Sequence, residues 1–528
     1  MLFLLPLEYF GKLFFGGRFV LYEISLRLKS GEHFVLRIIY FRMLFTMFVS
    51  LYTSRVVLNA LGVSDFGVYN VVGGMVAIFS FLNGTMSAAT QRFLSYAIGK
   101  GDNEQLMKIF NMTIFIHICI ALVILILGET IAVWFLNYKM NIPPNRIDAA
   151  NWVLHFSVIS IAINVIQVPY NAMIIAQEKM KIYAYFSIAE ATLKLLVAFL
   201  LTILFFDRLK LYSLLTLGST LVIMLMYSTY CIRKFHCKIR WVWTPYLLNS
   251  ILGFAGWNLS AQLAWIARTQ GVNILLNLFF GPSLNAARGI AVQVNGAITA
   301  FVSNFQLAVN PQIVKKYAQE EIEDMLKLLV YSSKYSYFLL YLFVLPFLLE
   351  SEYILKLWLH ILPEYVVVFT RMSLIAALVD TLSGTMVYGA LATGKIKKYQ
   401  LVMSGLFLLN PIVVYILFKM GQQPISIYVI DIIFYLFALL FRLSLLHNMI
   451  GLSLKKYLKN VVLLDLVVSL AAIIFPLILY MNMEESFFRF LLVGLLSVLS
   501  TSASIYLIGL NSYEKDKLKS IIRRYLKS

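Results

Sequence analysis

Long apolar segments separated by short polar or charged breaks recur along the chain from Tyr40 to Asn511. A helix needs about 20 apolar residues to cross the hydrocarbon core of a bilayer, and segments of this length predict about fourteen membrane-spanning helices. The predicted spans are 36–58, 68–89, 109–136, 150–175, 182–205, 211–232, 252–278, 284–309, 329–349, 366–392, 399–418, 425–446, 460–481 and 487–510. The pattern therefore predicts an all-α polytopic membrane protein.

The segment before the first predicted span has a different pattern. Residues 1–35 are apolar but are interrupted by Glu8, Lys12, Arg18 and Glu23, and no small-residue cleavage site follows them. A signal peptide would have such a site. The pattern favours an interfacial helix or an upstream extension.

The positively charged residues alternate between the two sides of the predicted spans. The N-terminal tail, every second loop and the C-terminal tail hold 30 lysine and arginine residues, among them Arg442, whereas the opposite side holds 6. These 6 are Lys139, Arg146, Arg208, Lys210, Lys356 and Lys419. Because cytoplasmic loops carry the excess of lysine and arginine, we expect both termini to be cytoplasmic.

The chain also contains an internal duplication, which a fixed shift in register reveals. A shift of 219 residues places the segment that begins at Leu61 on the one that begins at Phe280, with Gly62 on Gly281. A shift of 216 residues aligns "AQEKMKIY" from Ala176 with "ATGKIKKY" from Ala392. Six spans per repeat give both repeats the same orientation, as in some secondary transporters. We therefore expect an N-lobe over 36–245, a C-lobe over 246–450, and two extra helices with a basic tail over 451–528.

Composition supports the membrane prediction and excludes several classes of protein. The 528-residue chain is 61% hydrophobic and 13% charged, and its mean hydropathy is +0.83. Soluble domains are about 45–50% apolar and about 25% charged. These values exclude soluble, disordered, fibrous, nucleic-acid-binding and disulfide-rich secreted proteins. The net charge of +19 is explained by the basic cytoplasmic loops.

Motifs for enzymatic chemistry have little support. "GALATGK" from Gly389 fits a phosphate-binding loop, but Ile396 stands where serine or threonine would bind magnesium, and the segment ends a helix. The six histidines are scattered, the three cysteines are too sparse for a zinc site, and no paired acidic motif occurs. We therefore expect no enzymatic activity, no cofactor and no metal.

Basic residues inside the predicted spans are the more informative feature. A lysine or arginine at mid-membrane costs about 2.5–3.5 kcal/mol, so it usually faces a partner or a water-filled cavity. Lys334, Arg371 and Arg489 lie near span ends, and we expect them to extend to the lipid head groups. Lys194 follows Glu190 by four residues, which favours an ion pair on one helix face.

Four further arginines lie on spans that the duplication makes equivalent. Arg42 and Arg55 belong to the first span, and Arg268 and Arg288 to the seventh and eighth. Their staggered depths suggest a pathway for an anion, and the guanidinium fork suits phosphate oxygens. Pairing with carboxylates of other helices is the alternative, and it stays open at this stage. The acidic candidates are Asp380, Asp431 and Asp465.

Polar residues on the same spans are consistent with a cavity wall, although hydrogen bonds between helices explain some of them equally well. They include Asn70, Asn83 and Gln91 on span two, and Gln262, Gln270 and Asn273 on span seven. Gly73, Gly74 and Gly84 favour close helix packing. The candidate substrate-binding residues are Arg42, Arg55, Arg268, Arg288, Gln262, Asn83 and Gln91.

Two long segments resemble a known family. They are "LYTSRVVLNALGVSDFGVYNVVGGMVAIFSFLNGTMSAATQRFLSYAIGKGD" from Leu51, and "GFAGWNLSAQLAWIARTQGVNILLNLFFGPSLNAARGIAVQVNGAITAFVSNFQLAVNPQIVKKYA" from Gly253. Both are similar to bacterial polysaccharide-transport proteins of the multidrug/oligosaccharidyl-lipid/polysaccharide exporter superfamily. The likeness covers roughly residues 36–510.

This resemblance implies a function and a fold. It implies a flippase that moves undecaprenyl-pyrophosphate-linked oligosaccharide repeat units across the bacterial inner membrane for O-antigen or capsule assembly. The implied fold has two six-helix lobes around a central cavity, works by alternating access, and often carries two extra C-terminal helices. The implied partners are the polyprenyl diphosphate glycan, membrane lipids, and a polysaccharide polymerase with its chain-length machinery, with no nucleic acid.

Two other functions remain open. A cation-coupled multidrug antiporter of the same fold would favour acidic and aromatic cavity walls, whereas the repeat-core spans here are rich in cations. A membrane-embedded polysaccharide polymerase or transferase would favour a large external loop or clustered carboxylates. No predicted outer loop exceeds about twenty residues.

The charge bias makes a prediction about topology. The segment 234–240 should be cytoplasmic and the segment 350–364 external. Single cysteines introduced in each segment and treated with an impermeant thiol reagent in sealed cells should react in the second segment only. Reaction in the first segment would reverse the predicted orientation.

Overall fold

A computed structural model of the chain describes most of its residues. These are 30–80, short stretches at 86–87, 90–91, 93–94 and 97–98, and then 101–177, 179–203, 206–237, 240, 244–359, 361–393 and 396–516. Within these residues every regular element is helical and none is a strand. A helix pairs its own backbone N–H and C=O groups, and this is required in a membrane because hydrocarbon offers no hydrogen-bond partners.

The first half of the chain forms long helices that overlap the first six predicted spans, and the first helix includes the first span and part of the second. They are α3 (Ser30–Ala77) with η2 (Ile78–Ser80), α5 (Asn103–Leu127), which continues through the π-turn η3 (Gly128–Ala132) into α6 (Val133–Lys139), η4 (Pro144–Arg146), α7 (Ile147–Ala176), α8 (Met180–Ile203) and α9 (Arg208–Phe235).

The second half continues the same pattern. It contains α10 (Pro245–Phe280), α11 (Pro282–Ala318), α12 (Ile322–Leu349), α13 (Ser351–Trp358), α14 (Val366–Gly384), α15 (Met386–Ala392), α16 (Lys397–Lys419) and α17 (Ser426–Ile450). The last part contains α18 (Leu454–Tyr457), η5 (Leu458–Leu463), α19 (Leu464–Asn482), α20 (Phe487–Ser504) and η6 (Ile505–Gly509).

Two equivalent glycines divide helices at corresponding points of the duplication. Gly62 interrupts α3 with φ 78°, and Gly281 separates α10 from α11 with φ 82°. Residues with a side chain rarely adopt a positive φ, whereas glycine adopts it freely because it has no Cβ atom. α3 is therefore two helical arms joined at Gly62. The alignment of Gly62 with Gly281 predicted from the sequence corresponds to this shared turn.

Where the structure describes them, the predicted spans fall on these helices, and residues 81–85 and 88–89 of the second predicted span lie outside the described residues. Eleven of the described helical segments are long and apolar enough to cross a membrane, and one of them, Phe45–Ala77, includes parts of both arms of α3. α10 and α11, which correspond to the seventh and eighth spans, are not among the eleven, because amide side chains lower their hydropathy. The prediction of a polytopic all-helical fold is confirmed.

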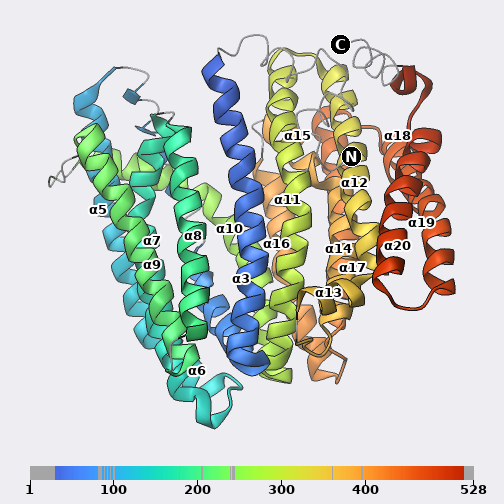
Figure 1. The fold of residues 1–528 in the computed structure, drawn as a ribbon. Helices are drawn as coiled ribbons and strands as arrows, with labels where there is room; N and C mark the ends of the chain where they lie inside the picture. Colours follow the sequence, from blue (N-terminus) through green and yellow to red (C-terminus); the bar gives the residue numbers. More distant parts are fainter. Residues whose placement is uncertain are drawn as a thin grey trace.

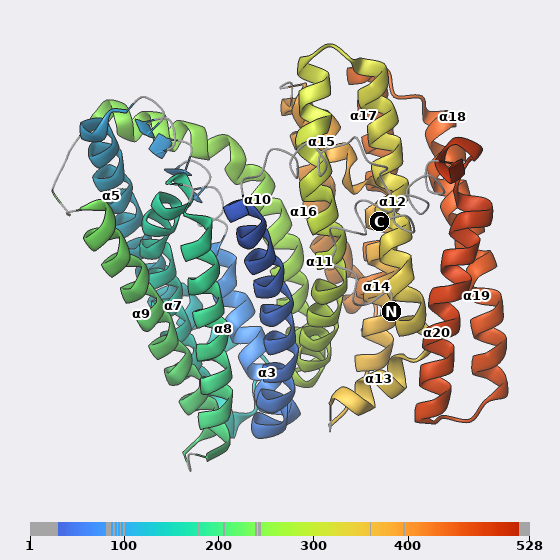
Figure 2. The ribbon, with the colours of Figure 1, turned by 45° about the horizontal axis from the view of Figure 1, so that its top comes forward.

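The helices are arranged around a central group. In Figures 1 and 2, α5, α7, α8 and α9 lie on one side and α12, α14, α16 and α17 on the other, with α3, α10 and α11 between them. α19 and α20 form the far edge and pack on α12. α6 and α13 lie at one end of the bundle, and α15 and α18 at the other. The exact lobe boundaries stay a prediction.

We call the end that holds α6 and α13 the turn end, because side-chain contacts place the Gly62 turn there. Trp358 of α13 donates from Nε1 to the carbonyl of Leu51, at 2.9 Å. Arg146, which follows α6, contacts Asp65, just after the Gly62 turn. The charge bias predicts that the turn end is external.

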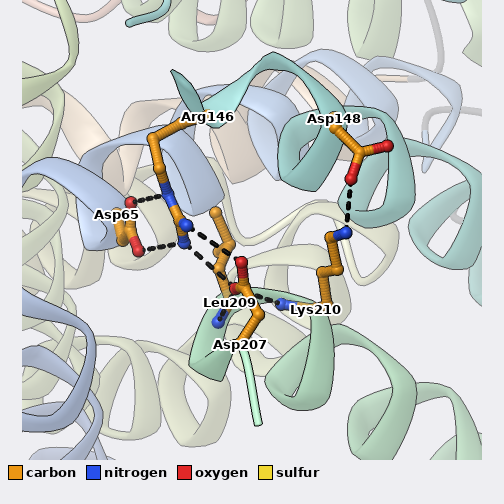
Figure 3. A network of polar contacts seen from close by, with 6 residues as sticks. All are labelled: Asp65, Arg146, Asp148, Asp207, Leu209 and Lys210. Atoms are coloured by element: carbon orange, nitrogen blue, oxygen red, sulfur yellow. Dashed lines mark hydrogen bonds and ion pairs between the residues drawn. The ribbon is translucent and has the colours of Figure 1, made fainter. Parts of the chain in front are cut away.

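Arg146 joins three helix ends at this turn end (Figure 3). Its guanidinium donates to Asp65 of α3, with Nε 2.8 Å from Oδ1, and to Asp207, with Nη1 2.9 Å from Oδ2. Asp207 also caps α9 by accepting from the backbone amides of Leu209 and Lys210. Partial burial raises the pKa of the Asp207 carboxyl. Arg146 and these amides lower that pKa by a larger amount, so it lies below its ordinary value. Lys210 pairs with Asp148 of α7 beside this cluster.

Ion pairs within the bundle correct part of the sequence prediction. The predicted Lys194–Glu190 pair is present at 2.7 Å. Lys334 does not extend to head groups: it is buried and pairs with Glu514 at 2.7 Å. Arg489 is likewise buried and pairs with Glu350 at 2.9 Å. These two expectations were wrong because each helix end is covered by another part of the chain.

Arg371, the third of these residues, is half-buried near the turn end. Its Nε donates to the carbonyl of Leu348 and to Ser351 Oγ, both at 3.1 Å. It therefore supports the junction between α12 and α13.

The Arg146 cluster should stabilise the bundle. Charge-assisted hydrogen bonds contribute about 1.5–3 kcal/mol, so Arg146→Ala should lower the free energy of unfolding by about that amount and reduce the melting temperature of purified protein in detergent. Lys194→Ala is the matched control, because an exposed pair within one helix contributes about 0.2–0.5 kcal/mol.

The same experiment has a defined pH dependence. A carboxyl whose pKa is lowered in the folded state stabilises it above the pKa of the unfolded state, about 4, and this stabilisation is lost as the pH falls through the folded value. The difference between wild type and Arg146→Ala should therefore be complete at pH 7 and shrink below about pH 4. Equal melting temperatures for Arg146→Ala and Lys194→Ala at pH 7 would contradict the stabilising role.

Candidate functional site

The second arm of α3 meets α10 and α11 through asparagine side chains. Asn273 of α10 donates from Nδ2 to the carbonyl of Asn70, at 3.2 Å. Asn285 of α11 donates to the carbonyl and the Oδ1 of Asn273, at 2.7 and 2.9 Å. Several polar residues predicted to line a cavity therefore bond to one another where the halves of the chain meet.

A second pair of asparagines joins the halves closer to the turn end. Asn277 of α10 accepts at Oδ1 from the backbone N–H of Asn141, at 3.0 Å, and donates from Nδ2 to the Asn141 carbonyl, at 3.2 Å. Asn277 is fully buried. Both of its amide groups are therefore satisfied by one residue of the other half.

Glycines allow the backbones of these helices to approach closely. A Cβ atom on Gly67 would lie 1.9 Å from the carbonyl oxygen of Pro282, and one on Gly74 would lie 2.5 Å from Asn273 Nδ2. A Cβ atom on Gly289 would lie 2.8 Å from Asn70 Oδ1. Side chains at these positions would push α3 away from α10 and α11. We call this contact, formed by the second arm of α3 against α10 and α11, the seam.

Arg268 lies deeper, inside the second half of the chain. Its guanidinium is buried, with 4% of the residue exposed, and its Nε and Nη2 donate to Asp431 Oδ1 at 3.2 and 2.9 Å. Asn410 of α16 donates to the same oxygen at 3.0 Å. The guanidinium also stacks over the rings of Tyr435 and Phe407, at 4.4 and 5.1 Å from their centroids. Three helices, α10, α16 and α17, therefore fix Arg268.

One hydrogen-bond donor of this cluster makes no hydrogen bond. Arg268 Nη1 is buried and has no hydrogen-bond partner. Burying such a group without a partner has a free-energy cost. The pairing alternative considered from the sequence is therefore present with Asp431, yet it does not use the whole guanidinium.

Arg288 approaches the same cluster from α11. Its Nη2 donates to the carbonyl of Thr269, at 2.9 Å, and its charge interacts with those of Arg268 and Asp431. Among the described side chains, no carboxylate forms an ion pair with Arg288. In the described part of the chain, Asp431 therefore forms an ion pair with Arg268 alone, and Arg288 adds a second positive charge close by.

A similar pair lies further along the second half. Arg442 belongs to α17 and is buried, contrary to its expected place in a loop. It contacts Asp380 Oδ1 at 3.5 Å and donates to Ser383 Oγ at 2.7 Å. Arg442 also lies within the predicted span 425–446, so its assignment to the loop was wrong, and α17 continues eight residues beyond it to Ile450.

The other predicted arginines lie in the first half, against α8. Arg42 donates from Nη1 to Ser187 Oγ at 3.4 Å and stacks over Tyr183 at 5.1 Å. Arg55 lines a pocket with Thr202 near the turn end. The structure thus brings Arg268 and Arg288 together and places Arg42 and Arg55 elsewhere.

The remaining candidates are less informative. Gln91 is half-buried on a short helical stretch. Asn83 and the side chain of Gln262 lie outside the described residues. In the part of the chain that the structure describes, no group of three or more His, Cys, Asp or Glu side chains is placed to hold a metal ion. Sequence reasoning missed Asn410, Phe407 and Tyr435. The sequence shows only that they are a polar residue and two aromatic residues within predicted spans, which does not indicate that they contact Arg268.

Comparisons with known proteins place this geometry in context. The MatE family model matches residues 39–200. No curated protein matches the sequence. Among solved structures, an inward closed conformation of the lipid II flippase MurJ is similar with a TM-score of 0.64 at 14% identity, covering 94% of this chain and 100% of that one.

Two further structures have the same arrangement of helices. An inward-facing multidrug resistance MATE family transporter of the MOP superfamily has a TM-score of 0.54 at 13% identity, covering 90% of this chain and 96% of that one. A MOP superfamily transporter from Pyrococcus furiosus has a TM-score of 0.54 at 14% identity, covering 79% of this chain and 96% of that one. The chain therefore has the fold of MOP superfamily transporters.

The seam predicts how a single methyl group should affect the contact between the halves. Gly67→Ala places a Cβ atom against the Pro282 carbonyl, so the halves must separate at the turn end, and overpacking of this kind costs about 1–3 kcal/mol. Spin labels on Ser64→Cys and Ser283→Cys, in a Cys119→Ser background, should show a longer or broader distance distribution. Gly73→Ala is the control, because nothing lies within 4 Å of the added atom. Identical distributions in the two variants would rule out a tight seam.

Proposed function

We propose that this chain is a flippase that moves an undecaprenyl-pyrophosphate-linked oligosaccharide repeat unit across the bacterial inner membrane by alternating access. The product would serve O-antigen or capsule assembly, beside a polysaccharide polymerase and chain-length machinery. The observation that carries this proposal is the spare donor of Arg268. A buried guanidinium N–H without a partner, beside the second guanidinium of Arg288, suits an anionic ligand.

The positions of these groups suggest how a diphosphate would be held. Asp431 occupies the Nε and Nη2 edge of Arg268, which leaves Nη1 for a phosphate oxygen. Arg288 adds a second positive charge from the neighbouring helix, so two arginines face one carboxylate. A diphosphate would offset this excess of positive charge, whereas a cationic ligand would add to it.

The seam suggests where the halves would separate. It holds them together at the turn end through short asparagine contacts and glycine approaches. Apolar side chains of both halves also meet there, among them Phe66, Leu276 and Ile290, so separation of the halves would need these side chains to find another apolar environment. Rocking about such a contact is the usual form of alternating access.

The comparisons agree with this proposal without deciding it. The lipid II flippase is similar over its whole length, and the similarity extends over 94% of this chain. That protein is named for moving lipid II. At 14% identity this likeness concerns the fold, so the substrate assignment rests on the arginine cluster.

A multidrug antiporter is the second candidate, and two observations favour it. A multidrug MATE transporter has the same fold. Asp431 and Asp380 also place carboxylates among aromatic rings, which is the environment that a coupling cation or a cationic drug would need. The two candidates differ in the charge of the substrate that the cluster attracts.

Variants of Arg268 test the flippase directly. Arg268→Lys keeps the charge but loses the fork, so flipping of a fluorescent polyprenyl diphosphate oligosaccharide in proteoliposomes should fall by about tenfold or more, the loss of one charge-assisted contact. Arg489→Lys is the matched control, because Arg489 is also buried and paired with a carboxylate, and its Nε, Nη1 and Nη2 all donate hydrogen bonds. We expect Arg489→Lys to flip the substrate at the wild-type rate per folded molecule.

A second pair of variants separates binding from folding. Arg268→Ala leaves the Asp431 carboxylate without its partner, which costs about 3–5 kcal/mol, so the amount of folded protein should fall. Arg268→Ala with Asp431→Asn should restore the amount of protein but not the flipping. Normal flipping per folded molecule in this double variant would eliminate Arg268 as a substrate contact.

A further inference from the structure

A pocket opens between α3 and α8 near the turn end, away from the Arg268 cluster. Its volume is about 470 Å³. It is lined by Tyr52, Arg55, Val56, Asn59 and Ala60 of α3, Thr202 of α8, and Arg208 at the start of α9. The two helices pack side by side, and Figures 1 and 2 both show α8 next to α3. A pocket of this size holds a small polar group such as a lipid head group.

The pocket is positively charged. Arg55 and Arg208 line it, and no acidic residue does. Arg208 donates from Nη1 to the carbonyl of Ala60 at 2.9 Å, and no ion pair joins it to a carboxylate among the described side chains. The acidic groups nearby are already occupied, since Arg146 pairs with Asp65 and Asp207 (Figure 3). The pocket therefore attracts anions.

An acceptor inside the pocket has no partner. Asn59 Oδ1 is buried and makes no hydrogen bond. An amide oxygen of this kind needs a donor such as a hydroxyl group, or its burial is costly. A ligand that carries both a phosphate and a hydroxyl group would satisfy the arginines and Asn59 together.

Apolar side chains continue from the pocket along the outside of the bundle. Phe48 of α3 is 69% exposed and stacks on Tyr52, and Phe199 and Ile203 of α8 are 60% and 49% exposed. In a helix bundle that spans a membrane, exposed aromatic and aliphatic side chains face hydrocarbon. The ligand therefore has an environment for hydrocarbon chains directly beside the polar pocket.

From these observations we propose that the pocket between α3 and α8 binds a lipid whose phosphate carries a hydroxyl-bearing group. Arg55 and Arg208 hold the phosphate oxygens, Asn59 accepts from the hydroxyl, and the chains lie on Phe48 and Phe199. An anionic phospholipid with a glycerol head group and a lipid-linked sugar share this chemistry. The site is separate from the Arg268 cluster, so it does not depend on the proposed transport function.

Lipid binding to the purified full-length protein in detergent tests this site. Native mass spectrometry would measure the dissociation constants of phosphatidylglycerol, undecaprenyl-diphosphate-linked sugar and inorganic pyrophosphate. Arg55→Gln with Arg208→Gln should weaken binding of at least one of the two lipids by about tenfold or more, since two charge-assisted contacts are lost. Lys139→Gln with Lys419→Gln removes two exposed charges at the same end of the bundle and should change the constants less than about twofold.

Two further variants keep the test decisive. Arg55→Lys with Arg208→Lys keeps the charge, so it should fold like the wild type and bind with intermediate affinity. Asn59→Ala should abolish any preference for phosphatidylglycerol over phosphatidic acid, which lacks the hydroxyl group. Melting temperatures without added lipid would confirm that the variants are folded.

The possible outcomes separate the two sources of lipid. Arginine-dependent binding of phosphatidylglycerol would identify a membrane lipid, and arginine-dependent binding of the lipid-linked sugar alone would identify an additional site for the transported molecule. Both outcomes support the proposal. Equal affinity of the wild type and Arg55→Gln/Arg208→Gln for both lipids, or pyrophosphate binding as tight as lipid binding, would overturn it.

Discussion

The constraint on which this structure depends is that a polar group inside a membrane protein must find its partner within the protein. Hydrocarbon offers no hydrogen bonds, so helices satisfy the backbone, and charged side chains are paired across helices. Arg268 with Asp431, Lys334 with Glu514, and Arg489 with Glu350 follow this rule. The rule has exceptions among the described residues, because several buried side-chain atoms have no hydrogen-bond partner, including both carboxylate oxygens of Asp465. Arg268 Nη1 and Asn59 Oδ1 belong to this group, and the two proposed ligand sites are built on them.

The same constraint explains why polar residues gather where the halves of the chain meet. The asparagines of α3, α10 and α11 bond to one another, and glycines let the backbones come close enough for these contacts. These amide and backbone contacts are short and specific. They lie beside an apolar cluster that also joins the halves, in which Phe66 packs with Leu276 and Ile290. Two further apolar clusters lie within the separate halves and hold each of them together.

Much of the fold could be predicted from the sequence because membrane helices have a strong one-dimensional pattern. Hydropathy located the spans, and the duplication placed Gly62 on Gly281, which the structure confirms as equivalent turns. Lys194 and Glu190 were predictable because their spacing is local. Lys334 and Arg489 were not, since their partners lie 180 and 139 residues away in the sequence. For Arg268 the sequence supplied three possible carboxylates, and only packing of α10 against α17 selects Asp431.

The charge of the transported molecule is the central question. Purified wild-type protein in proteoliposomes should flip a polyprenyl diphosphate oligosaccharide at a rate that saturates with substrate, and the same oligosaccharide on an uncharged polyprenol should not be flipped. The diphosphate is the group that the arginine cluster is suited to hold. Transport of a cationic dye down a cation gradient, with no flipping of the diphosphate lipid, would contradict this proposal and identify the chain as an antiporter.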